Sequence, residues 1–261
     1  MKIEVLIYMY YDKLLQLPDY GRLIVVTDLH GNYQDYMRYL ELWDFCDEDC
    51  HIVFAGDLIH SSSSIDYSVE IMDDVIAKSK SYSNFHVLLG NHEWAHITGT
   101  NIYKNAFNQR LTFEKLIKSR KGSLQPTLEN YIEFFKSLPY FIKTDNGLFI
   151  SHAGPSKKIN SMDDFKKIFS PDYENNYLYD FLWNRYKVNY DTEDVSKFMK
   201  IIGSNYMVIG HNPVNRYEIF GKQLIMSSSF QTDKKAYLDI DLSKNIEELQ
   251  DLMNNLKYLE G

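Results

Sequence analysis

Side chains that bind divalent metals follow five short apolar runs of this sequence, which begin at Leu23, His51, Phe85, Gly147 and Tyr206. The ends of these runs supply two carboxylates, three imidazoles and one amide: Asp28, His30, Asp57, Asn91, His152 and His211. Such a donor set suits two divalent ions, for which manganese, iron, zinc and magnesium are the candidates. The sequence therefore predicts a metal centre with two ions.

The spacing within the first group of donors has a physical reason. Alternate residues of an extended segment point the same way, so Asp28 and His30 are expected to grip one ion. Gly31 permits a tight turn after them, and Asn32 is placed to cap the helix that follows. Two ions about 3.5–4 Å apart need a bridging carboxylate, and we assign that role to Asp57.

The elements that must position these donors are strands and helices in alternation. Each apolar run predicts a buried strand that enters a loop, and ligands of open α/β sheets bind at such carboxyl ends. Helical periodicity covers residues 33–43, 65–79, 111–119 and 128–137. Further short strands are expected at 217–219, 223–226 and 236–240. The pattern favours an α/β fold with mixed sheets.

The domain organisation is expected to be simple. The chain has 261 residues and no repeat of fixed period, which favours a single domain over residues 1–261. Its core is expected at about 21–240, preceded by a helical segment at 1–20 and followed by a helix at about 245–258.

Composition excludes several classes of protein. Hydrophobic residues make up 44% and charged residues 25%, which is ordinary globular usage. Acidic residues outnumber basic ones by 36 to 28, so a protein that tracks extended nucleic acid is disfavoured. No apolar run is long enough to predict a membrane span, and no leader cleavage site follows the N-terminal run, so a cytoplasmic location is expected. Cys46 and Cys50 are expected to be plain thiols.

The motifs that carry the metal donors are Asp28-Leu29-His30-Gly31-Asn32, Gly56-Asp57, Gly90-Asn91-His92-Glu93, Ser151-His152-Ala153-Gly154 and Gly210-His211-Asn212-Pro213. They resemble those of the calcineurin-like metallophosphoesterases, and most closely those of prokaryotic-type protein serine/threonine phosphatases. The resemblance covers residues 21–240. It implies a four-layer αββα sandwich, with two mixed β-sheets flanked by helices and a dinuclear metal site at the C-terminal ends of strands.

The resemblance also implies a role for each residue. Asp28, His30 and Asp57 would hold the first metal, and the second would be held by Asp57, Asn91, His152 and His211. His92 would be the general acid, and Glu93 either orients its loop or is an exposed acid at a helix start. Pro213 stands where many relatives have a further histidine, so the first metal would have fewer protein ligands.

The second motif departs from the family pattern. The usual GD-x-x-D-R-G reads here Gly56-Asp57-Leu58-Ile59-His60-Ser61-Ser62, which lacks the supporting Asp and the phosphate-binding Arg. His60 is a candidate to replace the Asp, whereas His51, His86 and His96 are expected in surface or capping roles. Arg185 is the best remaining phosphate clamp. The insert at 98–126 either overhangs the site or forms a solvated helical cap.

The leading hypothesis is a dinuclear phosphomonoesterase, most closely a protein serine/threonine phosphatase that uses two manganese ions. A hydroxide between the ions would attack phosphorus in line. Catalysis is assigned to His92, Asp57 and Arg185, and substrate binding to Arg185, Asn91 and His92. The substrate would be a phosphorylated protein or a small phosphoester, and the chain a monomer or weak dimer. Two alternatives stay open: a dinucleoside polyphosphate or other nucleotide phosphoesterase, and a catalytically silent module that binds phosphorylated partners.

Overall fold

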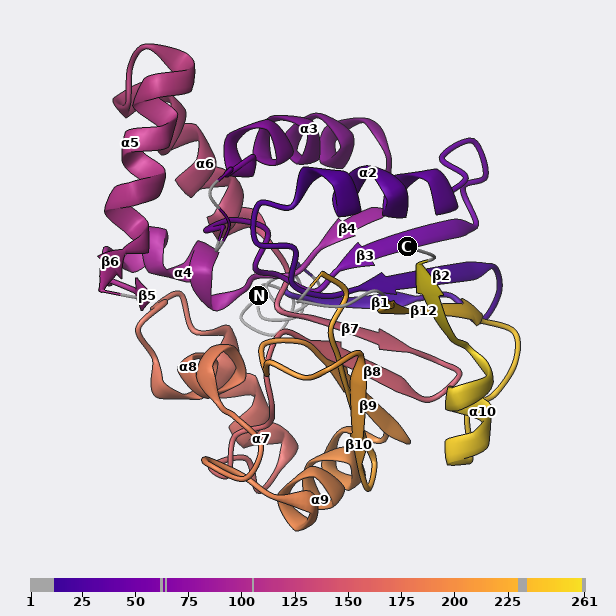
Figure 1. Cartoon of the computed structure of the whole chain (residues 1–261). Coiled ribbons are helices and arrows are strands. Elements are labelled where there is room, and N and C mark those ends of the chain that lie inside the picture. Colours follow the sequence, from indigo (N-terminus) through magenta and orange to yellow (C-terminus); the bar gives the residue numbers. More distant parts are fainter. Residues whose placement is uncertain (1–11, 62, 64, 105, 230–233, 260–261) are drawn as a thin grey trace, which may run out of the picture.

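Two large β-sheets lie face to face, and helices cover the outer face of each (Figure 1). The structure, a computed structural model, describes residues 12–61, 63, 65–104, 106–229 and 234–259. Helices α2 (Tyr33–Leu42) and α3 (Ser68–Ser81) cover one sheet, and α7 (Met162–Lys166), α8 (Asn176–Trp183) and α9 (Thr192–Ile202) lie over the other. The expected sandwich of two mixed sheets flanked by helices is confirmed.

Both large sheets combine parallel and antiparallel pairs. The first has the order β1 (Leu14–Leu17), β7 (Phe141–Thr144), β8 (Leu148–Ser151), β9 (Tyr206–Ile209), β11 (Gln223–Met226) and β10 (Tyr217–Phe220). The second has the order β13 (Leu256–Leu259), β12 (Lys235–Asp241), β2 (Arg22–Val26), β3 (Cys50–Phe54) and β4 (Phe85–Val87). Strands β2, β3 and β4 are parallel, as are β8, β9 and β11, whereas β12 and β10 run antiparallel to their neighbours.

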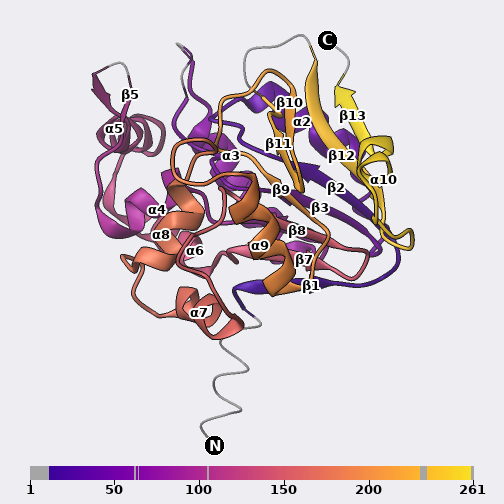
Figure 2. The same ribbon diagram turned by 90° about the horizontal axis from the view of Figure 1, so that it is seen from below.

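The remaining elements lie beside the sandwich. They are the helices α4 (Asn91–Thr98), α5 (Gln109–Lys121), α6 (Gln125–Ser137) and α10 (Leu249–Asn254), a 3₁₀ turn at Lys167–Phe169, and a hairpin of β5 (Tyr103–Lys104) and β6 (Phe107–Asn108). The hairpin and α5 stand on one side of the molecule, and α10 stands on the opposite side (Figure 2). No helix in the described part of the chain combines the length and the apolar character that crossing a bilayer requires.

The central strands are buried on both faces. Side chains alternate along a strand, so Leu23 and Val25 of β2 pack between the two sheets. Ile24 and Val26 point to the other face and pack in a separate hydrophobic cluster that includes residues of α2 and α3. All four side chains are 0% exposed, which explains why the sequence shows continuous apolar runs rather than an apolar–polar alternation. Such a scaffold fixes the ends of β2, β3, β8 and β9 tightly.

The two ends of the chain differ from expectation. Residues 1–11 of the expected N-terminal helical segment lie outside the described residues, and Leu14–Leu17 form a strand that pairs in parallel with β7. This pairing partner lies more than a hundred residues away, so local periodicity does not reveal it. The expected helix at about 245–258 is also wrong in extent, because α10 covers only Leu249–Asn254 and the chain then forms β13 against β12.

Candidate metal centre

The backbone takes a left-handed turn at four residues of the predicted site. The φ angles are 48° at His30, 54° at Asp57, 70° at His60 and 61° at His211. A non-glycine residue in this region costs about 1–3 kcal/mol, and such strain clusters at functional sites. His30 therefore does not follow the extended alternation that the sequence predicted for Asp28 and His30. The two side chains line the same cavity because the chain turns between them.

Two glycines are required by close approach. A Cβ atom on Gly90 would overlap the backbone nitrogen of Asp57, and one on Gly210 would overlap the carboxylate of Asp28. These glycines let the loops after β4 and β9 meet the ends of β3 and β2. The loops after β2 and β3 are also hydrogen-bonded to each other, since the backbone N–H groups of Leu29 and His30 donate to Asp57 O at 3.0 and 2.9 Å.

Three imidazoles direct a nitrogen lone pair toward Asp57 and the cavity. Nδ1 of His30 lies 3.1 Å from the carbonyl of Ile59, and Nδ1 of His152 lies 2.8 Å from that of Ala55. A carbonyl only accepts, so each ring donates its proton there. The ring of His211 likewise hydrogen-bonds to the backbone of Trp183, and its buried Nε2 has no partner among the described residues.

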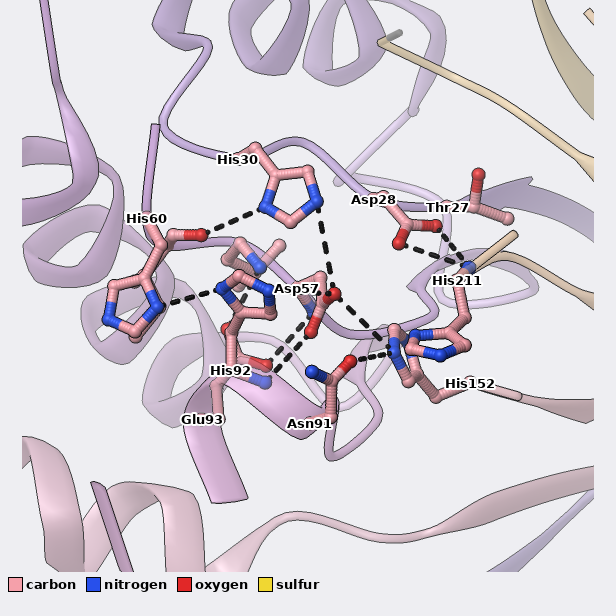
Figure 3. A network of polar contacts seen from close by, with 12 residues as sticks. Thr27, Asp28, His30, Asp57, His60, Asn91, His92, Glu93, His152 and His211 are labelled. Carbon is pink, nitrogen blue, oxygen red and sulfur yellow. Dashed lines mark hydrogen bonds and ion pairs between the residues drawn. The ribbon is translucent and has the colours of Figure 1, made fainter. Parts of the chain in front are cut away.

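The carboxylate of Asp57 stands between these rings (Figure 3). Its Oδ2 lies 3.9 Å from Nε2 of His30, 3.8 Å from Nε2 of His92 and 3.5 Å from Nε2 of His152. The first two and Asp57 form one group of potential metal donors, and Asp57, His152 and His211 form a second. Asp57 is the one member that the two groups share.

The surroundings of these side chains would be stabilised by a bound cation. Because Ala55 holds the single proton of neutral His152, Nε2 of this ring faces Oδ1 of Asn91 at 2.9 Å with two electron pairs opposed. Burial, with the neighbouring carboxylates of Glu93 and Asp28, raises the pKa of Asp57 well above its usual range. A divalent ion resolves both conflicts, because it accepts the lone pairs and stabilises the ionised carboxylate.

Asp28 lies beside these two groups rather than inside either. Both of its carboxylate oxygens accept from the backbone N–H of His211, at 3.1 and 3.0 Å. It follows the end of β2 and lines the same cavity as His30 and Asp57. The contact ties the β2 loop to the β9 loop across the two sheets.

Glu93 orients the loop that carries Asp57. Its carboxylate is 0% exposed and accepts the backbone N–H groups of Asp57 at 2.9 Å and of Leu58 at 2.8 Å. The alternative of an exposed acid at the helix start is therefore wrong. The backbone N–H of His92 completes the arrangement by donating to Asp57 Oδ1 at 3.0 Å.

A cavity of about 430 Å³ opens over the metal-donor groups. It brings together most predicted site residues and adds others from the hairpin and α8: Asp28, His30, Asp57, Asn91, His92, Ile102, Tyr103, Lys104, Trp183, Arg185, His211, Asn212, Pro213 and Ser227. His152 is 1% exposed and lies behind this wall, in contact with Asp57 and Asn91. The insert at 98–126 therefore overhangs the site through its hairpin, whereas no described residue of α5 lines the cavity.

Two residues at or beside the cavity were not predicted from the sequence. Lys104 lines the cavity, but nothing in its local sequence separates it from other lysines of the insert. His96 is buried rather than on the surface, and its ring lies beside that of His60. The four-residue spacing of His92 and His96 on one helix was the signal that could have found it.

A family model for calcineurin-like phosphoesterases matches residues 21–241 of the chain. The chain belongs to the calcineurin-like phosphoesterase family. The matched segment includes every predicted metal donor, and membership places the chain in the class of phosphoester hydrolases. The resemblance of its motifs is thereby confirmed.

The chain is also similar to individual phosphatases. A serine/threonine-protein phosphatase of Caenorhabditis elegans is 25% identical over 224 residues, which cover 78% of this chain and 46% of that protein. The chain thus spans about half the length of this curated relative. A protein serine/threonine phosphatase of Saccharomyces cerevisiae superposes with a TM-score of 0.73 at 17% identity, covering 99% of this chain and 88% of that one.

A further solved structure is a cold-active protein-tyrosine phosphatase of a Shewanella species. It superposes with a TM-score of 0.64 at 16% identity and covers 95% of this chain and 84% of that one. At this identity the two solved structures establish the shared fold alone.

Proposed function

We propose that this protein is a two-metal phosphomonoesterase that removes phosphate from serine and threonine side chains of proteins, with manganese as its metal. The observation that carries the proposal is the convergence of three imidazole lone pairs on the shared carboxylate of Asp57. A surface cluster of acids would not arrange backbone carbonyls to hold the outward ring proton of each histidine. Such outer contacts are typical of metal ligands.

The two ions would share Asp57, as the two donor groups do, but Asp28 would take the place of His92 at the first ion, and Asn91 would join the second. Asp28, His30 and Asp57 would hold one ion, and Asp57, Asn91, His152 and His211 would hold the other. The ions, once bound, would activate a water molecule for attack on phosphorus and neutralise the phosphoryl oxygens. Asp57 would contribute to both sites, which fits its central position and its contacts with rings from two loops and the start of α4.

The remaining steps belong to side chains at the cavity wall. Arg185 would bind the phosphoryl oxygens, because a guanidinium pairs with phosphate through two parallel hydrogen bonds. Lys104 faces the same cavity and would add a second positive charge. His92 and Asn91 would contact the substrate as well, and His92 would deliver a proton from Nε2 to the leaving oxygen.

The shape of the surface favours an extended substrate. A second depression, of about 460 Å³, shares Asp28 and His30 with the first and continues past Tyr33, Tyr67 and Ser61. Tyr33 and Tyr67 lie with their ring centroids 5.7 Å apart. A peptide with its phosphorylated side chain over the metals would lie along both depressions, whereas a compact phosphoester would fill only one.

A panel of substrates tests the proposal. Purified protein with and without added Mn²⁺ is assayed for phosphate release from phosphoserine, phosphothreonine and phosphotyrosine peptides and for cleavage of dinucleoside tetraphosphate. We expect manganese-dependent release that is fastest from the phosphoserine and phosphothreonine peptides. Cleavage of the dinucleotide without peptide turnover would support the nucleotide alternative, and inactivity toward every substrate and p-nitrophenyl phosphate would support a silent binding module.

A further inference from the structure

Three buried histidines form a continuous chain that leads away from the metal centre. Nδ1 of His92 lies 2.7 Å from Nδ1 of His60, and Nε2 of His60 lies 2.9 Å from Nε2 of His96. The three residues are 9%, 1% and 5% exposed in that order. Both nitrogens of the middle ring are thus engaged, one with each neighbour. We call His92, His60 and His96 the histidine chain.

The fold holds the histidine chain firmly. His92 and His96 lie one helical turn apart on α4, and the left-handed turn at His60 places its ring beside both. The backbone N–H of His60 donates to Oγ of Ser68 at 3.1 Å, which ties its loop to the start of α3. Phe113 of α5 packs edge-on against the rings of His60 and His96, at centroid distances of 5.7 and 5.2 Å.

Neutral rings make this chain directional. Burial lowers the pKa of His60 well below its usual range and, with Arg110 nearby, lowers that of His96 to about 3. A neutral imidazole carries one N–H and one lone pair. His60 can therefore donate toward only one neighbour and must accept from the other, so the position of the proton on His96 determines which nitrogen of a neutral His92 carries the proton.

We propose that His60 and His96 are positioning residues that hold His92 with Nδ1–H directed at His60 and with Nε2 directed at the leaving group of the substrate. The proposal deepens the function given above and rests on it. His60 stands where the motif usually has an acid, so a neutral pair of rings here takes over the orienting role of one carboxylate. His96 completes the pair, because its Nε2 accepts the hydrogen bond from the single N–H of His60.

Proton balance gives the direction of the chain. When the bond between phosphorus and the leaving oxygen breaks, the Nε2–H bond of the His92 imidazolium breaks and an O–H bond forms on the departing oxygen. The ring ends neutral only if it retains the Nδ1 proton. Nδ1 of His92 therefore donates to Nδ1 of His60, Nε2 of His60 donates to Nε2 of His96, and His96 carries its proton on Nδ1.

A spectroscopic test reads this pattern without turnover. Long-range ¹H–¹⁵N correlation spectra of ¹⁵N-histidine protein, assigned with single His→Gln variants, report which ring nitrogen is protonated. We expect an Nε2–H tautomer for His60 and an Nδ1–H tautomer for His96. The reverse pattern, or mixed tautomers for His60, would overturn the proposal even if the enzyme is fully active.

Substitutions that imitate single ring nitrogens test the catalytic consequence. The amide of Asn reaches the position of Nδ1, so His60→Asn retains a partner for His92, whereas His60→Leu removes it. General acid catalysis contributes about 10²–10⁴-fold, and it matters most for leaving groups of high pKa. We expect His60→Leu to lower kcat on a phosphoserine peptide about 100-fold and on p-nitrophenyl phosphate only a few-fold. His60→Asn is expected to restore most of the difference.

His96 is tested in the same way, and a double variant tests whether His60 acts through His92. The amide of Gln imitates Nε2, so His96→Gln is expected to exceed His96→Leu in kcat on the peptide. In a His92→Asn background, His60→Leu is expected to have no further effect. Equal losses on both substrates, or additive losses in the double variant, would show that His60 acts only through stability.

Phe113→Leu is the matched control, because it disturbs the packing around both rings and leaves their hydrogen bonds in place. It is expected to lower the melting temperature without changing the ratio of the two kcat values. Metal content is measured for each variant, so a lost ion is recognised as such. If the wild type is inactive on every phosphoester, the proposed function fails, whereas the tautomer pattern still decides the arrangement of the histidine chain.

Discussion

The two flanks of the cavity are built by different means. On the metal flank, formed by His30, Asp57, His152 and His211, side chains follow buried strands and backbone carbonyls orient the rings. On the substrate flank, formed by His60, His92, Lys104 and Arg185, side chains come from a loop, a helix start, a hairpin and a turn. Residues that directly follow a buried strand are held more firmly than residues on surface hairpins and turns. The metal flank therefore leaves little freedom, whereas the substrate flank admits changes of residue type.

The difference between the flanks gives a physical reason for the changed residues of the second motif. His60 and Ser61 stand on the substrate flank where the family pattern has an acid and an arginine. His60 contacts His92, as the acid is expected to do. Lys104 and Arg185 line the cavity and offer the positive charge that the missing arginine would supply. A comparable exchange at Asp57 would disturb both donor groups together. The two flanks should thus respond very differently to substitution.

The largest effect is expected from a ligand on the metal flank. Loss of an outer contact to a metal ligand alone costs about 10–100-fold, so His152→Ala, which removes a ligand, is expected to lower kcat/KM by more than ~100-fold. The manganese content measured by mass spectrometry should fall with it. His86→Ala, which changes a histidine next to His51 away from the cavity, is the control and should retain both ions. Full manganese occupancy in His152→Ala would remove this residue from the ligand set.

A slightly smaller effect is expected where the metal flank is supported from behind. Glu93→Leu leaves two buried backbone N–H groups, those of Asp57 and Leu58, without acceptors. Each orphaned group costs about 1–3 kcal/mol, so the free energy of unfolding in urea should fall by several kcal/mol. Manganese affinity is expected to fall about 10–100-fold, because Asp57 loses its orientation. Glu93→Gln, which keeps one acceptor, should lie between; a wild-type metal affinity in Glu93→Leu would argue against the coupling.

A moderate effect is expected on the substrate flank at Arg185. Hydrogen bonds to charged groups contribute about 1.5–3 kcal/mol, so Arg185→Ala should lower kcat/KM about 10–100-fold and weaken inhibition by inorganic phosphate similarly. Arg185→Lys keeps the positive charge but cannot form the two parallel hydrogen bonds of a guanidinium, so it should recover only part of the loss. Manganese content should stay unchanged, which separates this flank from the other. Arg120→Ala, in an exposed pair with Glu70, is the matched control. An unchanged phosphate inhibition constant would exclude Arg185 as the clamp.

The same contrast governs what the sequence could predict. Strands β2 and β3 were predictable, because continuous apolar runs are local signals. The candidate metal ligands that follow them were predictable as well, because polar residues after a strand are also a local signal. The strand at Leu14–Leu17 was not, because its identity depends on a distant partner. The burial of Glu93 and His96 was not either, since it depends on how α4 packs against the Asp57 loop and α5. Local motifs therefore predict the residues that gather on the metal flank, whereas the substrate flank depends on packing between elements that no local motif encodes.

The smallest effect is expected at Lys104, which belongs to the hairpin rather than to the sandwich. A partly exposed charge contributes up to about 1 kcal/mol, so Lys104→Ala should raise KM for a phosphopeptide no more than ~5-fold and leave kcat unchanged. The difference should vanish in about 1 M salt, where the Debye length falls to about 3 Å. Lys115→Ala, an exposed lysine on α5, is the control. A kcat effect that persists in high salt would mean that Lys104 takes part in the chemical step rather than in attracting the substrate. The hairpin would then be held as firmly as the metal flank.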